Sequence, residues 1–175
     1  MLGFPLGLLY ANAGEWLVHK HVLHGLGKHK NSYWAYHWHE HHRESRRNGN
    51  YDVNYKRTPF EWNSQSKELL GLIGLALAHV PLFPIAPWFT SAVWFSIWRY
   101  HRVHQRAHLD PAWAREHLPW HVDHHLGPNQ DANWCVTWPF FDILMGTADA
   151  YVGTQREMDD QKRAQKVNVG ATAMA

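Results

Sequence analysis

Histidine is the residue type that carries chemistry in this chain. The sequence has 16 histidines in 175 residues, and only His29 and His79 stand outside four dense blocks. The blocks are HKHVLH at 19–24, HWHEHH at 37–42, HRVHQRAH at 101–108 and HLPWHVDHH at 117–125. A neutral imidazole is the commonest metal ligand, and residues at i, i+3 and i+4 share one helix face. The blocks therefore predict a metal centre with enough ligands for two ions.

The third and fourth blocks have the clearest ligand spacing. The histidines of the third block are three and then four residues apart, and those of the fourth block are three residues and then one residue apart. Both spacings place the rings near one face of a helix. These candidate ligands are His101, His104, His108, His121, His124 and His125. His117 lies one turn before His121, and it is either a further ligand or a residue that orients one.

The first block leaves two alternatives. His19 and His24 are separated by five positions, which places them about 140° apart on an ideal α-helix. His21 shares a face with His24 better, so helix geometry favours His21 over His19. His19 and His24 can serve together only if they bind separate ions or the helix ends early.

The second block departs from a regular HxxHH pattern, because Trp38 stands where the first histidine belongs. The block offers either a pair at i, i+4 or a pair at i, i+3, and the two pairs face different ways. The first pair is His37 with His41, and the second is His39 with His42. All four remain candidate ligands.

The rest of the chain predicts the elements that position these blocks. Helices are expected over 1–24, 33–47 and 88–108, with a further helical segment over 112–126. The apolar span 69–98 is cut by prolines into two pieces of about a dozen residues, short of the roughly 20 needed to cross a bilayer. The two pieces predict a short hairpin that either dips into a membrane from one side or is buried in a soluble bundle. We predict one compact all-α helical bundle over 1–150, built from short apolar helices with a histidine-rich dimetal site at one end, and a polar, disordered tail over 151–175.

Composition excludes several functional classes. A formal charge of +2, without a basic patch interleaved with aromatics, argues against a nucleic-acid partner. The single Cys135 excludes an internal disulfide and a cysteine-based zinc site, and it suits a reducing compartment. No secretory signal peptide is expected at the N-terminus.

The ligand type narrows the metal chemistry without choosing one metal. Imidazole suits zinc, iron, copper and nickel alike. Few carboxylates stand near the blocks; they are Glu15, Glu40, Glu116 and Asp123. A histidine-rich pair of ions with few carboxylates favours redox chemistry over hydrolysis.

The order of the blocks resembles the fatty acid hydroxylase / sterol desaturase superfamily, which includes β-carotene hydroxylases. HKHVLHG is similar to its HxxxxH box, HVDHH to its final HxxHH box, and YHRVHQRAH to its third box. His104 lies 17 residues before His121, a separation like that in the family. The segment NWCVTWPFFDILMGT at 133–147 is similar to the family's closing segment. The resemblance covers roughly residues 10–147.

This resemblance implies an O2-dependent, non-haem di-iron oxygenase that hydroxylates or desaturates an unactivated C–H bond of a fatty acyl, sterol or carotenoid substrate. Two irons, for which zinc can substitute on purification, would be held by about eight histidines. His104 and His124 are the ligands expected to be indispensable for catalysis. Asp123 and Asp142 are candidates to orient imidazoles, and the alternative role of Asp142 is to cap a helix. Electrons would come from a ferredoxin or cytochrome b5-like donor, because the sequence has no flavin or nicotinamide fingerprint.

The resemblance also implies a membrane or membrane-associated enzyme with the metal site on the cytoplasmic side. Three alternatives stay open at this stage. The protein is a soluble, cytoplasmic di-iron oxygenase acting on a small polar molecule, a zinc-dependent hydrolase, or a non-catalytic metal-storage or metal-sensing protein.

Overall fold

The structure is a computed structural model that describes residues 2–172, with side chains described through residue 163. The described residues form helices and connecting turns, without a strand, which confirms the predicted all-α class. The elements are α1 (Gly3–Leu17), η1 (Val18–Leu26), η2 (His37–His42), α2 (Arg43–Arg47), η3 (Val53–Lys56), α3 (Ser64–Ala78), η4 (Val80–Leu82), α4 (Pro87–Leu109), α5 (Pro111–His117), α6 (Pro119–Leu126), α7 (Phe140–Leu144) and α8 (Gln155–Thr172).

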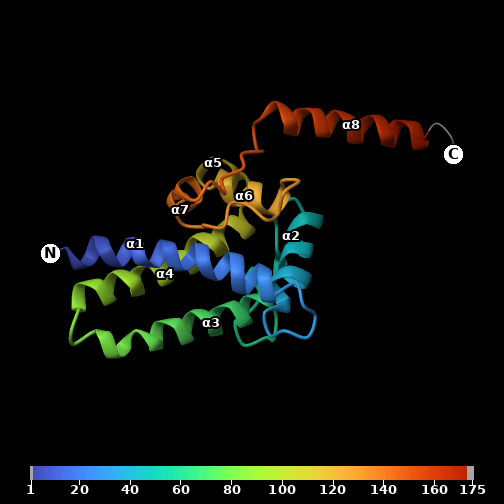
Figure 1. The fold of residues 1–175 in the computed structure, drawn as a ribbon. Coiled ribbons are helices and arrows are strands. Elements are labelled where there is room, and N and C mark those ends of the chain that lie inside the picture. The colour runs from blue at the N-terminus through green and yellow to red at the C-terminus, as the bar shows by residue number, and fades with distance from the viewer. Residues whose placement is uncertain (1, 173–175) are drawn as a thin grey trace.

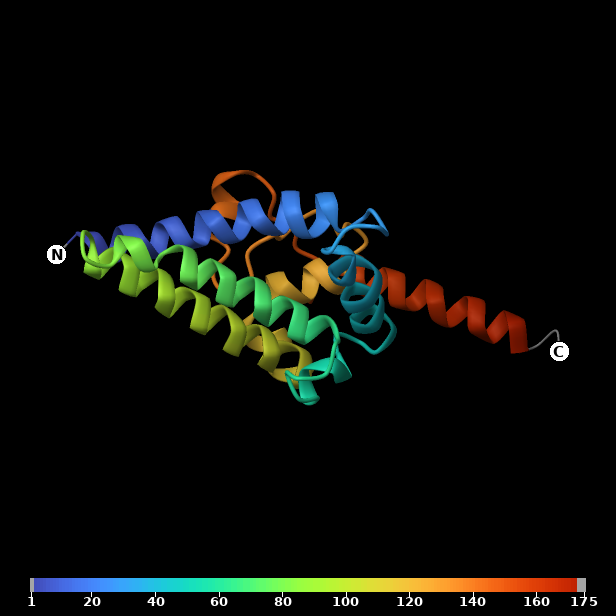
Figure 2. The same cartoon turned by 90° about the horizontal axis from the view of Figure 1, so that it is seen from below.

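The long helices α1, α3 and α4 lie side by side and form the body of the molecule (Figures 1 and 2). Glycine allows α1 to approach α4 closely. A Cβ atom at Gly7 would lie 2.5 Å from the carbonyl oxygen of Phe89 and 2.7 Å from the Cβ of Ala92. This contact fixes the direction in which α1 continues toward the first histidine block.

Helix α3 and helix α4 form the hairpin that the prolines of the apolar span predict. A capping box starts α3, because the Asn63 side chain accepts a hydrogen bond from Ser66 N and the Ser66 hydroxyl accepts one from Asn63 N. Pro87 starts α4 at a position where its missing N–H costs nothing. The turn between the two helices lies at the same end of the molecule as the N-terminus (Figure 2). None of the helices in residues 2–172 combines the length and apolar composition needed to cross a bilayer.

Three short elements that carry histidines, η1, η2 and α6, lie toward the opposite end, whereas η4 lies in the α3–α4 turn (Figure 1). The expected segment 112–126 is divided at Pro119 into α5 and α6, which pack on α4 through a small core of Ala107, Ala114, Leu118 and Val122. Residues 155–172, where we expected a disordered tail, form α8, which projects from the rest of the molecule (Figure 1). The division into a domain over 1–150 and a separate tail stays a prediction.

Candidate metal centre

Buried histidines from all four blocks form two adjacent groups at this end of the bundle. Within each group, the potential ligand atoms lie within 4.8 Å of one another. The first cluster is His19, His24, His37, His42 and His124. The second cluster is His41, His104, His108 and His125, together with His121, whose Nε2 lies 3.0 Å from the Nε2 of His108. The histidine-rich site at one end of the bundle is thus present.

The first two blocks lie in π-helices, η1 and η2, and this explains a spacing that α-helix geometry disfavours. A π-helix bonds each residue to the one five positions away, so residues five apart come onto one face. The rings of His19 and His24 are 5.1 Å apart, and those of His37 and His42 are 4.9 Å apart. The expected replacement of His19 by His21 is therefore not seen: His19 lies in the cluster, while His21 is exposed.

The second block divides between the two clusters in a way that neither expected pairing describes. His37 pairs with His42 in the first cluster, and His41 faces the second. Adjacent residues of a helix point about 100° apart, so neighbouring histidines reach different clusters. The structure leaves His39 outside both, where its Nε2 lies 3.1 Å from the carbonyl oxygen of Lys28.

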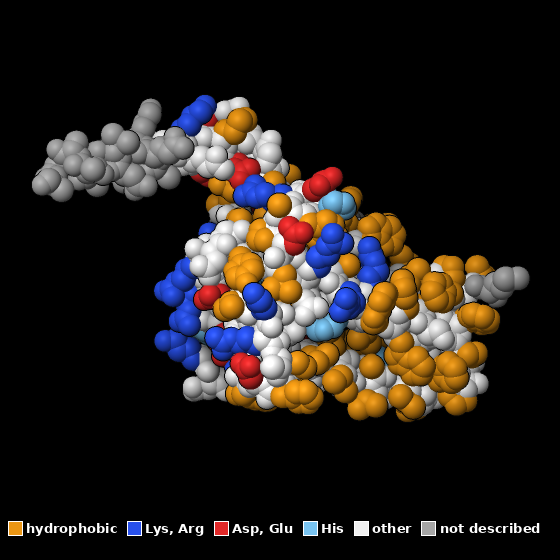
Figure 3. Space-filling model, turned by 180° about the vertical axis from the view of Figure 1, so that it is seen from behind, with side chains coloured by type: hydrophobic (Ala, Val, Ile, Leu, Met, Phe, Trp, Pro, Cys, Tyr) orange, Lys and Arg blue, Asp and Glu red, His pale blue; other side chains and the backbone are white. Residues whose placement is uncertain are grey.

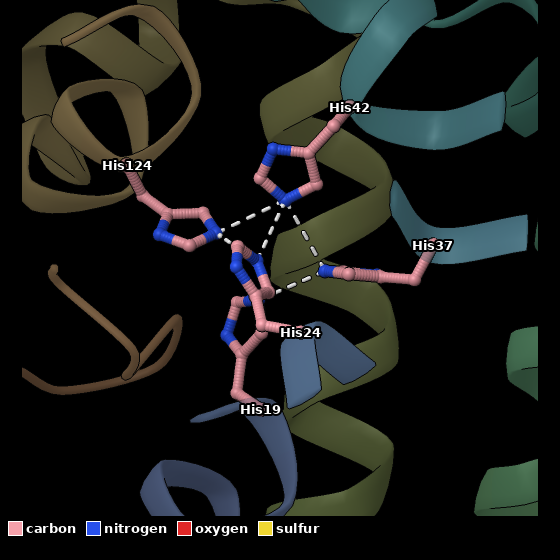
Figure 4. A group of neighbouring side chains, drawn as sticks. All are labelled: His19, His24, His37, His42 and His124. Carbon is pink, nitrogen blue, oxygen red and sulfur yellow. Dashed lines mark hydrogen bonds between the residues drawn. The ribbon is translucent and has the colours of Figure 1, made fainter. Parts of the chain in front are cut away.

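The imidazoles of the first cluster converge through their Nε2 atoms (Figure 4). The Nε2 atoms of His24, His42 and His124 are each 3.1 Å from the other two. That of His37 lies 3.2 Å from His42 and 3.0 Å from His19. Five nitrogen atoms therefore surround a single small space.

Most of these rings are held in place by a hydrogen bond of the Nδ1 atom, on the side of the ring away from the shared space. The Nδ1 atoms of His19 and His124 lie 2.5 and 2.6 Å from the carbonyl oxygens of Trp134 and Ala132. The Nδ1 of His42 lies 3.1 Å from Oε1 of Gln130. A carbonyl oxygen only accepts, so each Nδ1 carries the proton and each Nε2 presents a lone pair.

With these tautomers, the contact between the Nε2 atoms of His42 and His124, drawn dashed in Figure 4, sets two lone pairs against each other at 3.1 Å, and they repel. A metal ion between them removes this conflict. Two nitrogens bound about 2.1 Å from one ion at right angles would be about 3.0 Å apart, and about 3.4 Å apart in a tetrahedral site. The observed 3.0–3.2 Å spacing thus matches five or six ligands around one ion better than a tetrahedral site.

Burial keeps these imidazoles neutral and so able to bind metal. Desolvation, followed by repulsion from neighbouring histidines, holds the pKa values of His19, His37 and His42 well below the ordinary value. Burial lowers the pKa of His124 to about 4, even though its bond to Ala132 opposes the change. Neutral imidazole is the form that binds metal.

The second cluster has a similar convergence but different supporting groups. The Nε2 atoms of His104 and His108 are 3.2 Å apart. The Nδ1 of His41 lies 2.9 Å from the carboxylate of Asp52, and that of His104 lies 2.9 Å from the carboxylate of Glu68. Buried Nε2 atoms of His41 and His125 have no hydrogen-bond partner among the described residues, which is the expected state of metal ligands.

Several residues singled out from the sequence lie outside both clusters. His101 is half-buried, with its Nδ1 3.9 Å from Glu68. His117 is exposed and stacks on Trp113, and His79 lies 3.2 Å from the hydroxyl of Tyr10. On α4, His101 lies a turn before His104 and faces α3, away from the convergence point.

Among the described residues, Asp123 and Asp142 bond backbone N–H groups and the Thr147 hydroxyl rather than an imidazole, so the expected orienting role is not seen. Asp123 accepts hydrogen bonds from the backbone N–H groups of residues 151 and 152. Asp142 accepts from Trp134 N and Cys135 N, and so supports the loop whose carbonyl oxygens hold His19 and His124. The carboxylates that do contact cluster rings are Asp52, Glu68 and Asp131. Each lies more than ten residues from its partner in the sequence, and no local spacing identifies it.

A cavity of about 930 Å³ extends from the first cluster along the long helices. His19 and Glu68 line its inner part together with Tyr36 and Tyr100. Most of the remaining wall is apolar and comes from α1, α3 and α4, including Leu72, Leu75, Val93 and Phe95. An apolar molecule in this cavity would lie with one part against the histidines.

Comparison with protein-family models, curated proteins and solved structures finds no match for this chain.

Proposed function

We propose that this protein is an O2-dependent, non-haem di-iron oxygenase that hydroxylates or desaturates an unactivated C–H bond of a lipid-like substrate. The observation that supports this most strongly is the pair of buried histidine clusters, one of which contributes His19 to the wall of an apolar cavity. The order of the histidine blocks along the chain supports the same class of enzyme.

The residues present suit a pair of iron ions. The first cluster would hold one ion and the second cluster the other, and zinc can take either place on purification. The pair, when bound, supplies O2 activation and oxidation of the C–H bond. The spacing of the first cluster favours a five- or six-ligand site over the tetrahedral arrangement of a structural zinc.

The chain itself supplies orientation and exclusion of water. The apolar walls of the cavity would align a hydrocarbon chain or ring system and keep bulk water from the histidines. His19 lies both in the first cluster and in the cavity wall, so the reacting carbon would be held beside this cluster. A separate ferredoxin or cytochrome b5-like protein would deliver electrons.

Membrane association belongs to this proposal. The sequence has no Asp, Glu, Lys or Arg over residues 1–14 or 69–98, which form α1, α3, η4 and the first half of α4. Many of their large apolar side chains are exposed, and they gather at the end of the molecule that holds the N-terminus (Figure 3). Such a surface suits insertion into one leaflet, with the metal end in the aqueous phase on the cytoplasmic side.

An isotope experiment separates this function from a zinc-dependent hydrolase. Reduced, iron-loaded protein is incubated with lipid extract under ¹⁸O2, and the products are analysed by mass spectrometry. The proposal predicts an alcohol that carries one ¹⁸O atom, or an alkene that has lost two hydrogens. Products labelled only from H2¹⁸O, formed equally without O2, would instead identify a hydrolase.

A further inference from the structure

The two clusters differ in the charge of the groups that support them. In the first cluster, His19, His42 and His124 are held by neutral carbonyl or amide oxygens. Its one carboxylate contact within residues 2–163 is a 3.3 Å approach of Asp131 to the Nδ1 of His24. Asp131 is 55% exposed and is paired with Lys28 at 2.7 Å, so its charge is largely screened and neutralised.

The second cluster is supported by two buried carboxylates. Asp52 is fully buried against His41, and the side chain of Glu68 is 7% exposed against His104. Within the part of the chain that the structure describes, no lysine or arginine pairs with either carboxylate. The remaining bonds come from neutral donors: Asn54 N bonds Asp52, and the Tyr55 hydroxyl bonds Glu68 at 2.6 Å.

Buried charge requires compensation, and no lysine or arginine among the described residues supplies it for Asp52 or Glu68. A cation bound by the adjoining imidazoles would supply it. A divalent ion in the second cluster would be balanced by Asp52 and Glu68. The same ion in the first cluster would meet neutral groups and one neutralised carboxylate. A carboxylate that accepts the Nδ1 proton also makes the imidazole a stronger ligand.

We infer that the two metal sites are inequivalent: the second cluster binds its ion first and more tightly, and Asp52 and Glu68 are the positioning residues responsible. This inference rests on the proposed dimetal centre but not on the reaction that the centre performs. The first cluster, which lines the cavity, would hold the more exchangeable ion.

The test is a titration of chelator-treated, full-length protein with Co²⁺, followed by its visible absorption at constant pH without O2. Wild-type protein should bind two ions in two resolved steps. His37→Ala should remove the weaker step, and His41→Ala should remove the tighter one. Loss of the tighter step in His37→Ala, or binding of both ions with one affinity, would overturn the inference.

Substitutions that keep the shape of the two carboxylate side chains and remove their charge test whether this charge causes the tighter binding. Asp52→Asn and Glu68→Gln retain an acceptor oxygen, and each should weaken the tighter step by roughly 10–100-fold while leaving the weaker step unchanged. Asp131→Asn is the matched control and should leave the tighter step unchanged. Unchanged affinities in both carboxylate variants would refute the assigned roles. Protein that binds no cobalt would contradict the metal centre itself, whereas two ions bound in the opposite order would contradict only this inference.

Discussion

The second ring nitrogen of each histidine determines what the first can do. Backbone carbonyl oxygens fix the Nδ1 protons of His19 and His124, and this leaves their Nε2 lone pairs directed at the other imidazoles of the first cluster. In the second cluster, Asp52 and Glu68 have the same role for His41 and His104. The metal-binding property thus depends on groups that are not themselves ligands.

Removing one ring should remove one ion. We predict that His124→Ala, and likewise His104→Ala, lowers the metal content from two ions per chain toward one and abolishes turnover, because each ring belongs to a buried, convergent set. The matched control is His117→Ala, an exposed histidine outside both clusters, which should retain two ions. The metal content of the purified variants is measured by elemental analysis. Full metal content and activity in His124→Ala would contradict the role of His124 as a ligand.

The metal-free protein should lose stability as the pH falls. The folded-state pKa of His124 is about 4, and burial also lowers the pKa values of His19, His37 and His42, whereas the unfolded value is near 6.5. Below pH 6.5 the unfolded state therefore binds more protons than the folded state, and the free energy of unfolding decreases. Each such histidine contributes a slope of up to about 1.4 kcal/mol per pH unit between pH 6.5 and its folded pKa.

This pH dependence is measurable by urea denaturation of chelator-treated protein between pH 8 and pH 4. We expect a plateau at the alkaline end and a steep loss of stability below pH 6.5. A free energy of unfolding that stays constant from pH 7 to pH 5 would show that the histidines are not buried in neutral form.

At the scale of the elements, local helix type and close packing position the histidines. The π-helical segments η1 and η2 turn pairs five residues apart into neighbours. The contact of Gly7 with α4 sets how α1 approaches the other helices. The π-helical segments carry the clustered histidines themselves, whereas the Gly7 contact acts on the site from a distance.

The approach of α1 to α4 can be tested with two glycines of the same helix. Gly7→Ala places a methyl group against the Phe89 carbonyl, and we expect it to destabilise the fold by roughly 1–3 kcal/mol. Gly14→Ala meets nothing within 4 Å and should stabilise α1 by about 0.5–1 kcal/mol. Thermal unfolding of both variants in the same metal state gives the comparison; equal stability of the two would contradict the packing of α1 described here.

The sequence alone predicted the elements better than the details of the site. Periodicity and prolines predicted the helical class, the α3–α4 hairpin and the histidine-rich end. The ideal α-helix wrongly favoured His21 over His19, since nothing in HKHVLH signals a π-helix. Asp52 and Glu68 could not be found because they meet His41 and His104 only through tertiary folding.

For the whole molecule, the main feature is the separation of an apolar end from a metal-binding end. The charge-free segments are bordered by charges of both signs. Glu15 follows the first segment, with Lys20 beyond it, and the second lies between Lys67-Glu68 and Arg99. Trp and Tyr at such a boundary, with flanking basic residues, are typical of proteins that sit in a membrane interface. Helix α3, with 15 residues, is about 22 Å long, which is less than the ~30 Å hydrocarbon core of a bilayer.

Vesicle flotation tests this orientation. Wild-type protein should float with phosphatidylcholine vesicles, and the double variant Ile85→Glu/Trp88→Glu should lose at least about 10-fold in partitioning, since charges in the hydrocarbon region cost a few kcal/mol each. Ile85 is 82% exposed and Trp88 is 66% exposed, both beside the α3–α4 turn. The control Phe60→Glu changes a side chain that is 96% exposed but lies outside the charge-free segments, and it should float like wild type. Equal flotation of the double variant and wild type would place the membrane contact elsewhere.

The proposed di-iron centre is tested most directly by the metal content of protein purified without O2 from iron-replete cells. Native mass spectrometry gives the number and identity of the ions, and optical spectra are recorded before and after exposure to air. We expect two irons per chain, one for each histidine cluster, and a spectrum that changes when O2 is admitted to the reduced protein. One or no tightly bound ion per chain would contradict the two-cluster centre, and two zinc ions with no response to O2 would contradict the oxygenase.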